Sequence, residues 1–213
     1  YLACGIAEES GEVVILSCTG ATASRNYVPG LTEAYYRKLP IVTITSFNGN
    51  HYLGNLMPQN IDRTVIPKDV AKISVHLPVV KDEQDEWLCN VLCNRAILEA
   101  TRNGGGPVHI NLTTTYQGTF TTKSLPAQRV VKRLTIDDEL PSLADSRIAI
   151  FIGAHRKFTN EETQAIDEFC EKYQAFVACD HTSSYHGNYR LLSALASVNF
   201  ARSDGGWDEI KPD

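Results

Sequence analysis

The chain has 213 residues, of which 43% are hydrophobic and 21% charged, and its formal net charge is −5 at pH 7. These totals are typical of a globular protein with one large domain or two modest ones. They argue against nucleic-acid binding, which needs clustered lysines and arginines, and against a membrane span, which needs about 20 consecutive apolar residues.

The six cysteines are expected to be reduced thiols with structural roles. Cys89 and Cys93 are four residues apart and share one face of a helix, but no second Cys or His pair accompanies them. Since a zinc site needs four clustered ligands, no metal site is predicted. Reduced thiols and the lack of a signal-peptide pattern in residues 1–9 predict a cytoplasmic protein.

The predicted elements alternate between strands and helices along the chain. Short, β-branched apolar runs occur at 13–18, 40–45, 108–112, 148–152 and 175–179. Runs of this kind are typical of strands buried on both faces of a parallel sheet. Helical patterns occur at 22–37, 83–102 and 160–173. The alternation predicts an α/β fold with parallel sheets.

A polar, threonine-rich stretch separates two such patterns. We predict a first domain over residues 1–115, a linker over 116–145 that runs across the surface, and a partial α/β domain over 146–213. Residues 1–7 resemble the second half of a helix, and residues 210–213 resemble the approach to a strand. We therefore expect both ends to be truncation points, with an unusual natural terminus as the alternative.

The most informative turn follows the first apolar run. Residues 17–27 turn at Gly20 and open a helix, and ligands of open α/β sheets bind outside the carboxyl ends of strands. Thr19 and Thr22 are expected to cap that helix. The turn has neither the Gly-Lys-Ser/Thr of a phosphate loop nor a Gly-x-Gly-x-x-Gly fingerprint. An ordinary strand–turn–helix remains the alternative.

Five segments, in order, resemble the thiamine-diphosphate-dependent enzymes. The segment ILSCTGATASRNYVPGLTEAYYRKLPIVTIT is similar to their strand–turn–helix–strand, and the others are YLACGIAEESGE, MPQNIDRTVIPKDVAKISVHLP, AILEATRNGGGPVHINL and RIAIFIGAHRKFTNEETQAIDEFCEKYQAFVACD. The most similar members are the acetolactate synthases and the menaquinone-pathway succinyl-enolpyruvyl-cyclohexene-carboxylate synthases. Each segment alone is a weak signal, whereas five in the family's order are specific.

This resemblance implies a three-layer pyrimidine-binding domain followed by an incomplete central domain. It implies a parent enzyme that decarboxylates or joins 2-oxo acids with thiamine diphosphate and Mg²⁺, as a homodimer or tetramer. The family's activating glutamate is expected upstream of Tyr1, so no catalytic residue is assigned here. The Mg²⁺ ligands belong to a separate domain in the family. We therefore expect this chain alone to bind the cofactor weakly or not at all.

The resemblance also assigns candidate cofactor-binding residues. Gly20, Ala21 and Thr22 match the loop beside the cofactor pyrimidine, although Ala21 stands where the acetolactate synthases have proline. Asn26 matches an Asn on the following helix, with tying that helix to a loop as its alternative role. Gln59 matches a Gln that reaches the cofactor and substrate adduct, where an amide can stabilise a developing enolate without adding charge. An unremarkable loop position is the alternative for Gln59.

Three histidines require an interpretation. His51 lies in a polar, aromatic loop after a strand end, which makes it a candidate substrate contact, with an ordinary surface loop as the alternative. His76 and His109 lie in strand-like runs and are expected to be hydrogen-bonded core groups.

Two other functions stay open for the whole chain. One is a non-catalytic relative with the same fold, and the other is a nucleotide-binding α/β module.

Overall fold

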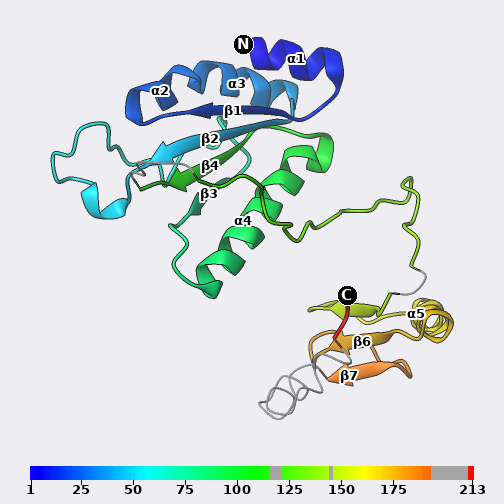
Figure 1. Ribbon diagram of the computed structural model, residues 1–213. Helices are drawn as coiled ribbons and strands as arrows, with labels where there is room; N and C mark the ends of the chain where they lie inside the picture. Colours follow the sequence, from blue (N-terminus) through cyan, green and yellow to red (C-terminus); the bar gives the residue numbers. More distant parts are fainter. Residues whose placement is uncertain (116–120, 144–145, 193–210) are drawn as a thin grey trace. The chain divides into compact units, whose positions relative to one another are not determined.

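The computed structural model describes residues 1–115, 121–143, 146–192 and 211–213, which form two compact units, Tyr1–Thr135 and Ile136–Asp213 (Figure 1). Each unit contains a parallel sheet with flanking helix, so the predicted α/β class is confirmed. The division falls inside the stretch 116–145 that the sequence predicts as a linker. Parts of that stretch, 116–120 and 144–145, and the predicted strand approach at residue 210 lie outside the described residues.

The first unit is built on a four-stranded parallel sheet. Its strands are β1 (Val14–Cys18), β2 (Ile41–Phe47), β3 (Ser74–Leu77) and β4 (Val108–Thr113), in the order β1-β2-β4-β3. The strand-like run around His76 is observed as β3, although its four residues alternate polar and apolar side chains and are too few to form an apolar run. All four carboxyl ends meet at one edge of the sheet, where ligands of such folds bind.

Helices cover both faces of this sheet. On one face lie α1 (Leu2–Ser10), α2 (Ala21–Asn26) and α3 (Val28–Arg37), and on the other lies α4 (Glu83–Thr101) (Figure 1). The α1–α3 side holds a core around Leu31, Ala34 and Ile41. The α4 side holds a second core around Val108 and Ile110.

The predicted single helix over 22–37 is wrong, because the chain forms two helices that meet at Tyr27. Tyr27 ends α2 with φ −92° and ψ −8° and also precedes the first residue of α3. Pro29 stands in the first turn of α3. Proline has no N–H to donate to the carbonyl four residues earlier and its ring crowds that carbonyl, so a continuous helix through this position is disfavoured.

The prediction that the strands are buried on both faces is also wrong at two positions. Ile15 of β1 is 65% exposed and Phe151, in the second unit, is 77% exposed. β1 is an edge strand, and α4 packs mainly on β2, β3 and β4. Burial on both faces therefore holds for the first four residues of the central strand β4 and fails at Ile15 and Phe151 on the edge strands β1 and β5 (Ala149–Ile152).

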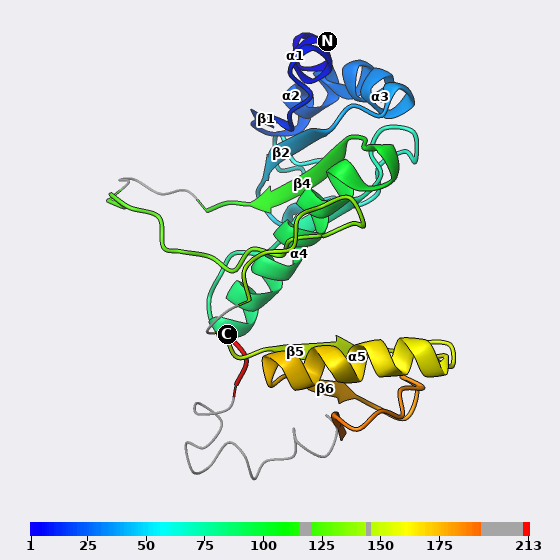
Figure 2. The ribbon, with the colours of Figure 1, turned by 90° about the vertical axis from the view of Figure 1, so that its right-hand side faces the viewer.

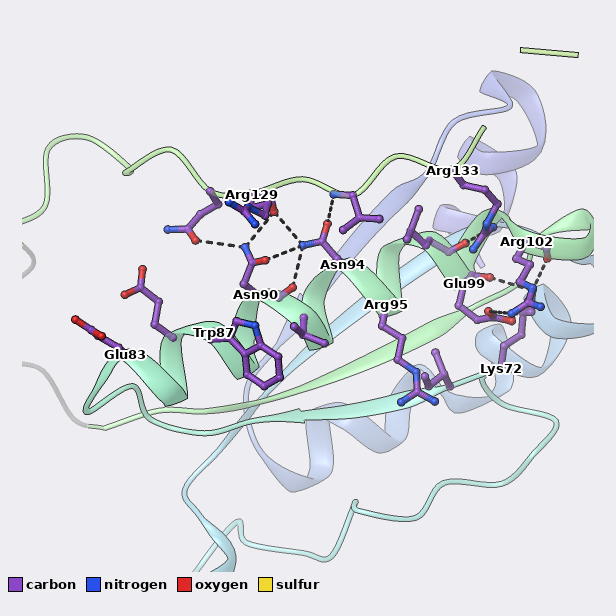
Figure 3. Close-up of a pocket in the computed structure, with 16 residues that line it drawn as sticks. Lys72, Glu83, Trp87, Asn90, Asn94, Arg95, Glu99, Arg102, Arg129 and Arg133 are labelled. Carbon is purple, nitrogen blue, oxygen red and sulfur yellow. Dashed lines mark hydrogen bonds and ion pairs between the residues drawn. The ribbon is translucent and has the colours of Figure 1, made fainter. Parts of the chain in front are cut away.

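Part of the predicted linker runs over the surface along α4, to which it is hydrogen-bonded. The Asn94 side chain donates to Arg129 O at 3.0 Å and accepts from Val131 N at 2.8 Å, and Asn90 Nδ2 also donates to Arg129 O at 3.0 Å (Figure 3). Arg133 Nη1 donates to Leu98 O at 3.0 Å. Two asparagines on one helix face thus hold an otherwise irregular segment by its backbone.

The second unit is a smaller sheet with one helix. Its strands β5 (Ala149–Ile152), β6 (Phe176–Cys179) and β7 (Arg190–Leu192) are parallel in the order β5-β6-β7, and α5 (Asn160–Tyr173) lies along β5 and β6 (Figure 2). A capping box starts α5, with Thr159 and Glu162 each bonding the other's backbone N–H. Cys170 and Val177 are fully buried between helix and sheet.

Candidate functional site

The candidate site lies at the carboxyl edge of the first sheet, where β1 ends. Residues 19–22, which we call the Gly20 corner, lead from β1 into α2, with Gly20 as the N-cap. The segment between β2 and β3 closes on this corner. A Cβ atom placed on Gly20 would lie 3.1 Å from Gln59 O and 3.3 Å from Gln59 Cβ. Glycine is therefore required for the close approach of the two backbones.

The structure brings Thr22 and Gln59 together across 37 residues of sequence. Gln59 Oε1 accepts from Thr22 Oγ1 at 3.2 Å and from Thr22 N at 3.4 Å. The expectation that Thr19 and Thr22 cap α2 is wrong, because the N-cap is Gly20 and the Thr22 N–H donates to the distant Gln59 side chain instead. The Gln59 amide nitrogen donates to none of the described residues, so its two N–H groups are available to a ligand.

The remaining predicted site residues differ in their placement. Ala21 is buried under the corner, whereas Asn26 ends α2 with an exposed side chain that bonds to no described residue. His51 lies in a short 3-10 helix, Asn50–Tyr52, after β2, where its exposed ring packs on Tyr52 at 4.0 Å between centroids. The structure therefore joins Gly20, Thr22 and Gln59, and leaves His51 in a surface loop.

A buried polar network lies behind the corner on the α1–α3 side of the sheet. Thr45 Oγ1 is its centre and contacts the Tyr27 hydroxyl, His109 Nε2 at 3.1 Å and Cys18 Sγ at 3.8 Å. His109 Nδ1 lies 2.8 Å from Ser74 Oγ, so both ring nitrogens have partners. Every strand of the sheet supplies one member of this network.

Burial is the main cause of the shifted pKa values in this network. Desolvation is the main cause that raises the pKa of Tyr27 to about 12, and desolvation together with the nearby charge of Arg63 lowers the pKa of His109 to about 4. The pKa of His76 is also lowered, first by burial. His76 bonds Asn111 and Thr113 through its two ring nitrogens, at 2.9 and 3.2 Å. The prediction of a hydrogen-bonded core group is confirmed for His109, which is 2% exposed, whereas His76 is hydrogen-bonded but only half-buried.

Arg63 is a member of this region that the sequence analysis did not single out. It is only 2% exposed, and its guanidinium bonds Ser24 Oγ at 3.2 Å and Ser46 O at 2.5 Å. Burial lowers its pKa. An arginine in a polar loop segment is normally exposed, and sequence pattern carries no signal for its burial.

The other expectations concern thiols, metals and membranes. All six cysteines are free thiols, and Cys4, Cys170 and Cys179 are buried. The described ranges contain no group of three or more His, Cys, Asp or Glu side chains that could hold a metal ion. Over the same ranges, no helix has the length and apolar character that a bilayer span requires.

Known proteins resemble this chain over more than half of its length. It is 38% identical over 136 residues to the 2-succinyl-5-enolpyruvyl-6-hydroxy-3-cyclohexene-1-carboxylate synthase of Bacteroides thetaiotaomicron. The matched residues make up 62% of this chain and 24% of the relative. The chain is homologous to a segment of these synthases. The synthase of Phocaeicola vulgatus is 37% identical over the same shares, and that of Geobacillus kaustophilus is 34% identical over 113 residues, or 52% of the chain and 19% of the relative.

The homology confirms the family resemblance for one of the two groups named from sequence, the succinyl-enolpyruvyl-cyclohexene-carboxylate synthases. The chain spans about a quarter of the length of these synthases. No protein-family model matches the chain.

Proposed function

We propose that this chain provides the pyrimidine-binding domain and part of the central domain of a thiamine-diphosphate-dependent enzyme that transfers an acyl group from a 2-oxo acid. The Gly20 corner carries the proposal. It is a tight turn at the carboxyl edge of a parallel sheet, with the Gln59 amide held against it in a chain homologous to the synthases.

The residues at the corner fit the pyrimidine half of the cofactor. Gly20 exposes backbone rather than a side chain, and the Gln59 N–H groups are neutral donors with no partner among the described residues. Neutral donors suit an aminopyrimidine ring and an adduct oxygen, because they orient both without a fixed charge. The diphosphate and its Mg²⁺ need oxygen ligands, which we assign to another part of the enzyme.

The reaction follows from the relatives' name and from the cofactor. Their product bears a succinyl group on a ring carbon. When bound, thiamine diphosphate supplies the carbanion equivalent of an acyl group derived from a 2-oxo acid with loss of CO₂. The residues of this chain would hold the pyrimidine and present the Gln59 N–H groups to the oxygen of the adduct. An acetolactate synthase-like reaction uses the same donor step with another acceptor.

The sites of such enzymes form between subunits, so the proposal includes a homodimer or tetramer of the whole protein. The exposed Thr22 and Gln59 then meet the rest of the cofactor site on the partner. We propose a cytoplasmic location, as expected for an enzyme with free thiols.

Calorimetry on the whole protein tests this function. We expect thiamine diphosphate to bind in the presence of Mg²⁺, and CO₂ to be released from a 2-oxo acid only when both are present. The Gln59→Ala variant should bind and turn over more weakly, whereas Gln164→Ala on α5 should match the wild type. Cofactor-independent CO₂ release would contradict the proposal. Binding without any turnover of 2-oxo acids would favour the non-catalytic relative.

A further inference from the structure

Arg63 carries a buried positive charge that no carboxylate among the described residues neutralises. It is 2% exposed, and both of its hydrogen bonds go to neutral acceptors, Ser24 Oγ and Ser46 O. Its Nε is buried with no hydrogen-bond partner. Burying an ion is costly unless a counter-charge offsets the loss of its hydration. Stability alone is therefore a poor reason for an arginine at this position.

The contacts of Arg63 join three elements at the carboxyl edge. Nη1 reaches Ser24 in α2, and Ser24 Oγ in turn donates to Ala21 O at 2.7 Å, next to Gly20. Nη2 reaches Ser46 O at the end of β2, and the guanidinium lies 5.5 Å from the centroid of the Phe47 ring. A planar fork with several donors can make these contacts at once, whereas a lysine ammonium is a single point charge.

Gln59 has little else to hold it at the Gly20 corner. Its backbone adopts φ 60°, a left-handed conformation that is strained for a residue with a side chain. Its two bonds to Thr22 are exposed and long. Arg63 follows Gln59 by four residues, a stretch that spans at most about 14 Å when fully extended. A fixed Arg63 therefore confines Gln59 to the neighbourhood of the corner.

We propose that Arg63 is a positioning residue: its guanidinium fastens the segment between β2 and β3 to α2 and to the end of β2, and thereby holds the Gln59 amide against the Gly20 corner. Its consequence for catalysis rests on the proposed function, whereas the placement of Gln59 does not. Without the Arg63 guanidinium, Gln59 leaves the Gly20 corner while the apolar core on the α4 side stays intact.

Nuclear Overhauser spectroscopy on the 213-residue chain tests the placement without any cofactor. The wild type should show a cross-peak between Gly20 Hα and Gln59 Hβ, because a Cβ on Gly20 would lie 3.3 Å from Gln59 Cβ. We expect this cross-peak to be lost in Arg63→Gln and weakened in Arg63→Lys, with core cross-peaks between Val42 and Val108 kept. Arg25→Gln, which removes the same charge from an exposed position on α2, should keep the corner cross-peak.

Two results would overturn the proposal. One is a Gly20–Gln59 cross-peak as strong as the wild type's in both Arg63 variants. The other is loss of the corner and core cross-peaks together in Arg63→Lys, which would make Arg63 a general support of the fold. If Arg63→Gln does not fold, Arg63→Lys decides the question by the same two criteria.

Activity of the whole protein supplies a second readout. Arg63→Lys should lower kcat about tenfold through misplacement of the amide. The same change should have no further effect in a Gln59→Ala background, since no amide is left to position. A further tenfold loss in that background would contradict the positioning role. If the whole protein proves not to use thiamine diphosphate, the proposed function fails while the cross-peak test of Arg63 still stands.

Discussion

The two faces of the first sheet are built from different chemistry. The face toward α4 presents Val42, Val108 and Ile110 to a helix whose buried positions are Ala96 and Ala100. The face toward α1–α3 also packs on an apolar core, but it adds threonine, histidine and asparagine side chains from β2, β3 and β4: Thr43, Thr45, His76, His109 and Asn111. The α4 face is held by packing, whereas the α1–α3 face combines packing with hydrogen bonds, and the candidate site lies at the edge of the α1–α3 face.

The two faces therefore contribute differently: one mainly to the free energy of unfolding, the other to the exact positions of α2 and the Gln59 segment. Apolar packing is non-directional and tolerates small shifts, whereas hydrogen bonds fix donors and acceptors to a few tenths of an ångström. A polar face beneath a corner therefore holds α2 and the Gln59 segment in one arrangement. The apolar face supplies the free energy of unfolding that permits a buried ion and a polar network on the other side.

The largest expected effect is on the apolar face. Ile110→Ala should lower the free energy of unfolding by about 2–5 kcal/mol, because it leaves a cavity under α4. Urea denaturation followed by circular dichroism measures this. The matched control is Ile15→Ala on the edge strand, where the side chain is 65% exposed and the expected loss is below about 1 kcal/mol. An equal loss of unfolding free energy in the two variants would contradict the conclusion that the α4 face is the main source of stability.

The second effect is a pH dependence from the polar face. The His109 pKa falls from 6.5 in the unfolded chain to about 4 in the fold. Above pH 6.5 both states are neutral and stability is complete. As pH falls from 6.5 to 4 the unfolded chain alone gains the proton, so the free energy of unfolding should drop by about 3 kcal/mol.

Urea titrations at pH 7.5 and pH 4.5 measure this drop. In His109→Gln most of it should disappear, and the remainder should come from His76 and from carboxyl groups such as Glu162, whose pKa values are also lowered in the fold. A pH dependence that His109→Gln leaves unchanged would show that another group is responsible.

The third effect concerns the centre of the polar network. Thr45→Val keeps the side-chain shape but removes the hydroxyl that contacts Tyr27, His109 and Cys18. We expect a loss of about 1–3 kcal/mol, because buried partners are left unsatisfied. Thr43→Val removes one hydrogen bond, to Val108 O at 3.0 Å, and should cost about 1 kcal/mol in the same urea assay. A larger loss at Thr43 would contradict the central role of Thr45.

The smallest expected effect on stability is at the site itself. Gln59→Ala removes only exposed bonds to Thr22, so the free energy of unfolding should change by less than about 0.5 kcal/mol. Gly20→Ala should cost more, because its Cβ meets Gln59 O at 3.1 Å and must displace that segment. A destabilisation by Gln59→Ala as large as that of Thr45→Val would show that the Gln59 segment is part of the core.

The sequence by itself determined the class of fold and most of its elements. Apolar β-branched runs located five of the strands, and the helix predicted at 160–173 is observed as α5 (Asn160–Tyr173). Glycine and proline marked the turns, because backbone conformation depends strongly on those residues. The helix predicted over 83–102 is observed as α4 (Glu83–Thr101). These features are local, so a pattern over 5 to 20 residues contains them.

Only the tertiary structure decided which residues meet. Thr22 and Gln59 are 37 residues apart, and Arg63 and Ser24 are 39 apart, so no local pattern joins them. The burial of Arg63 and the sharing of Thr45 by three partners follow from the order β1-β2-β4-β3, which brings sequence-distant strands into register. Periodicity shows which side of an element is apolar, but the fold selects the partners that face it.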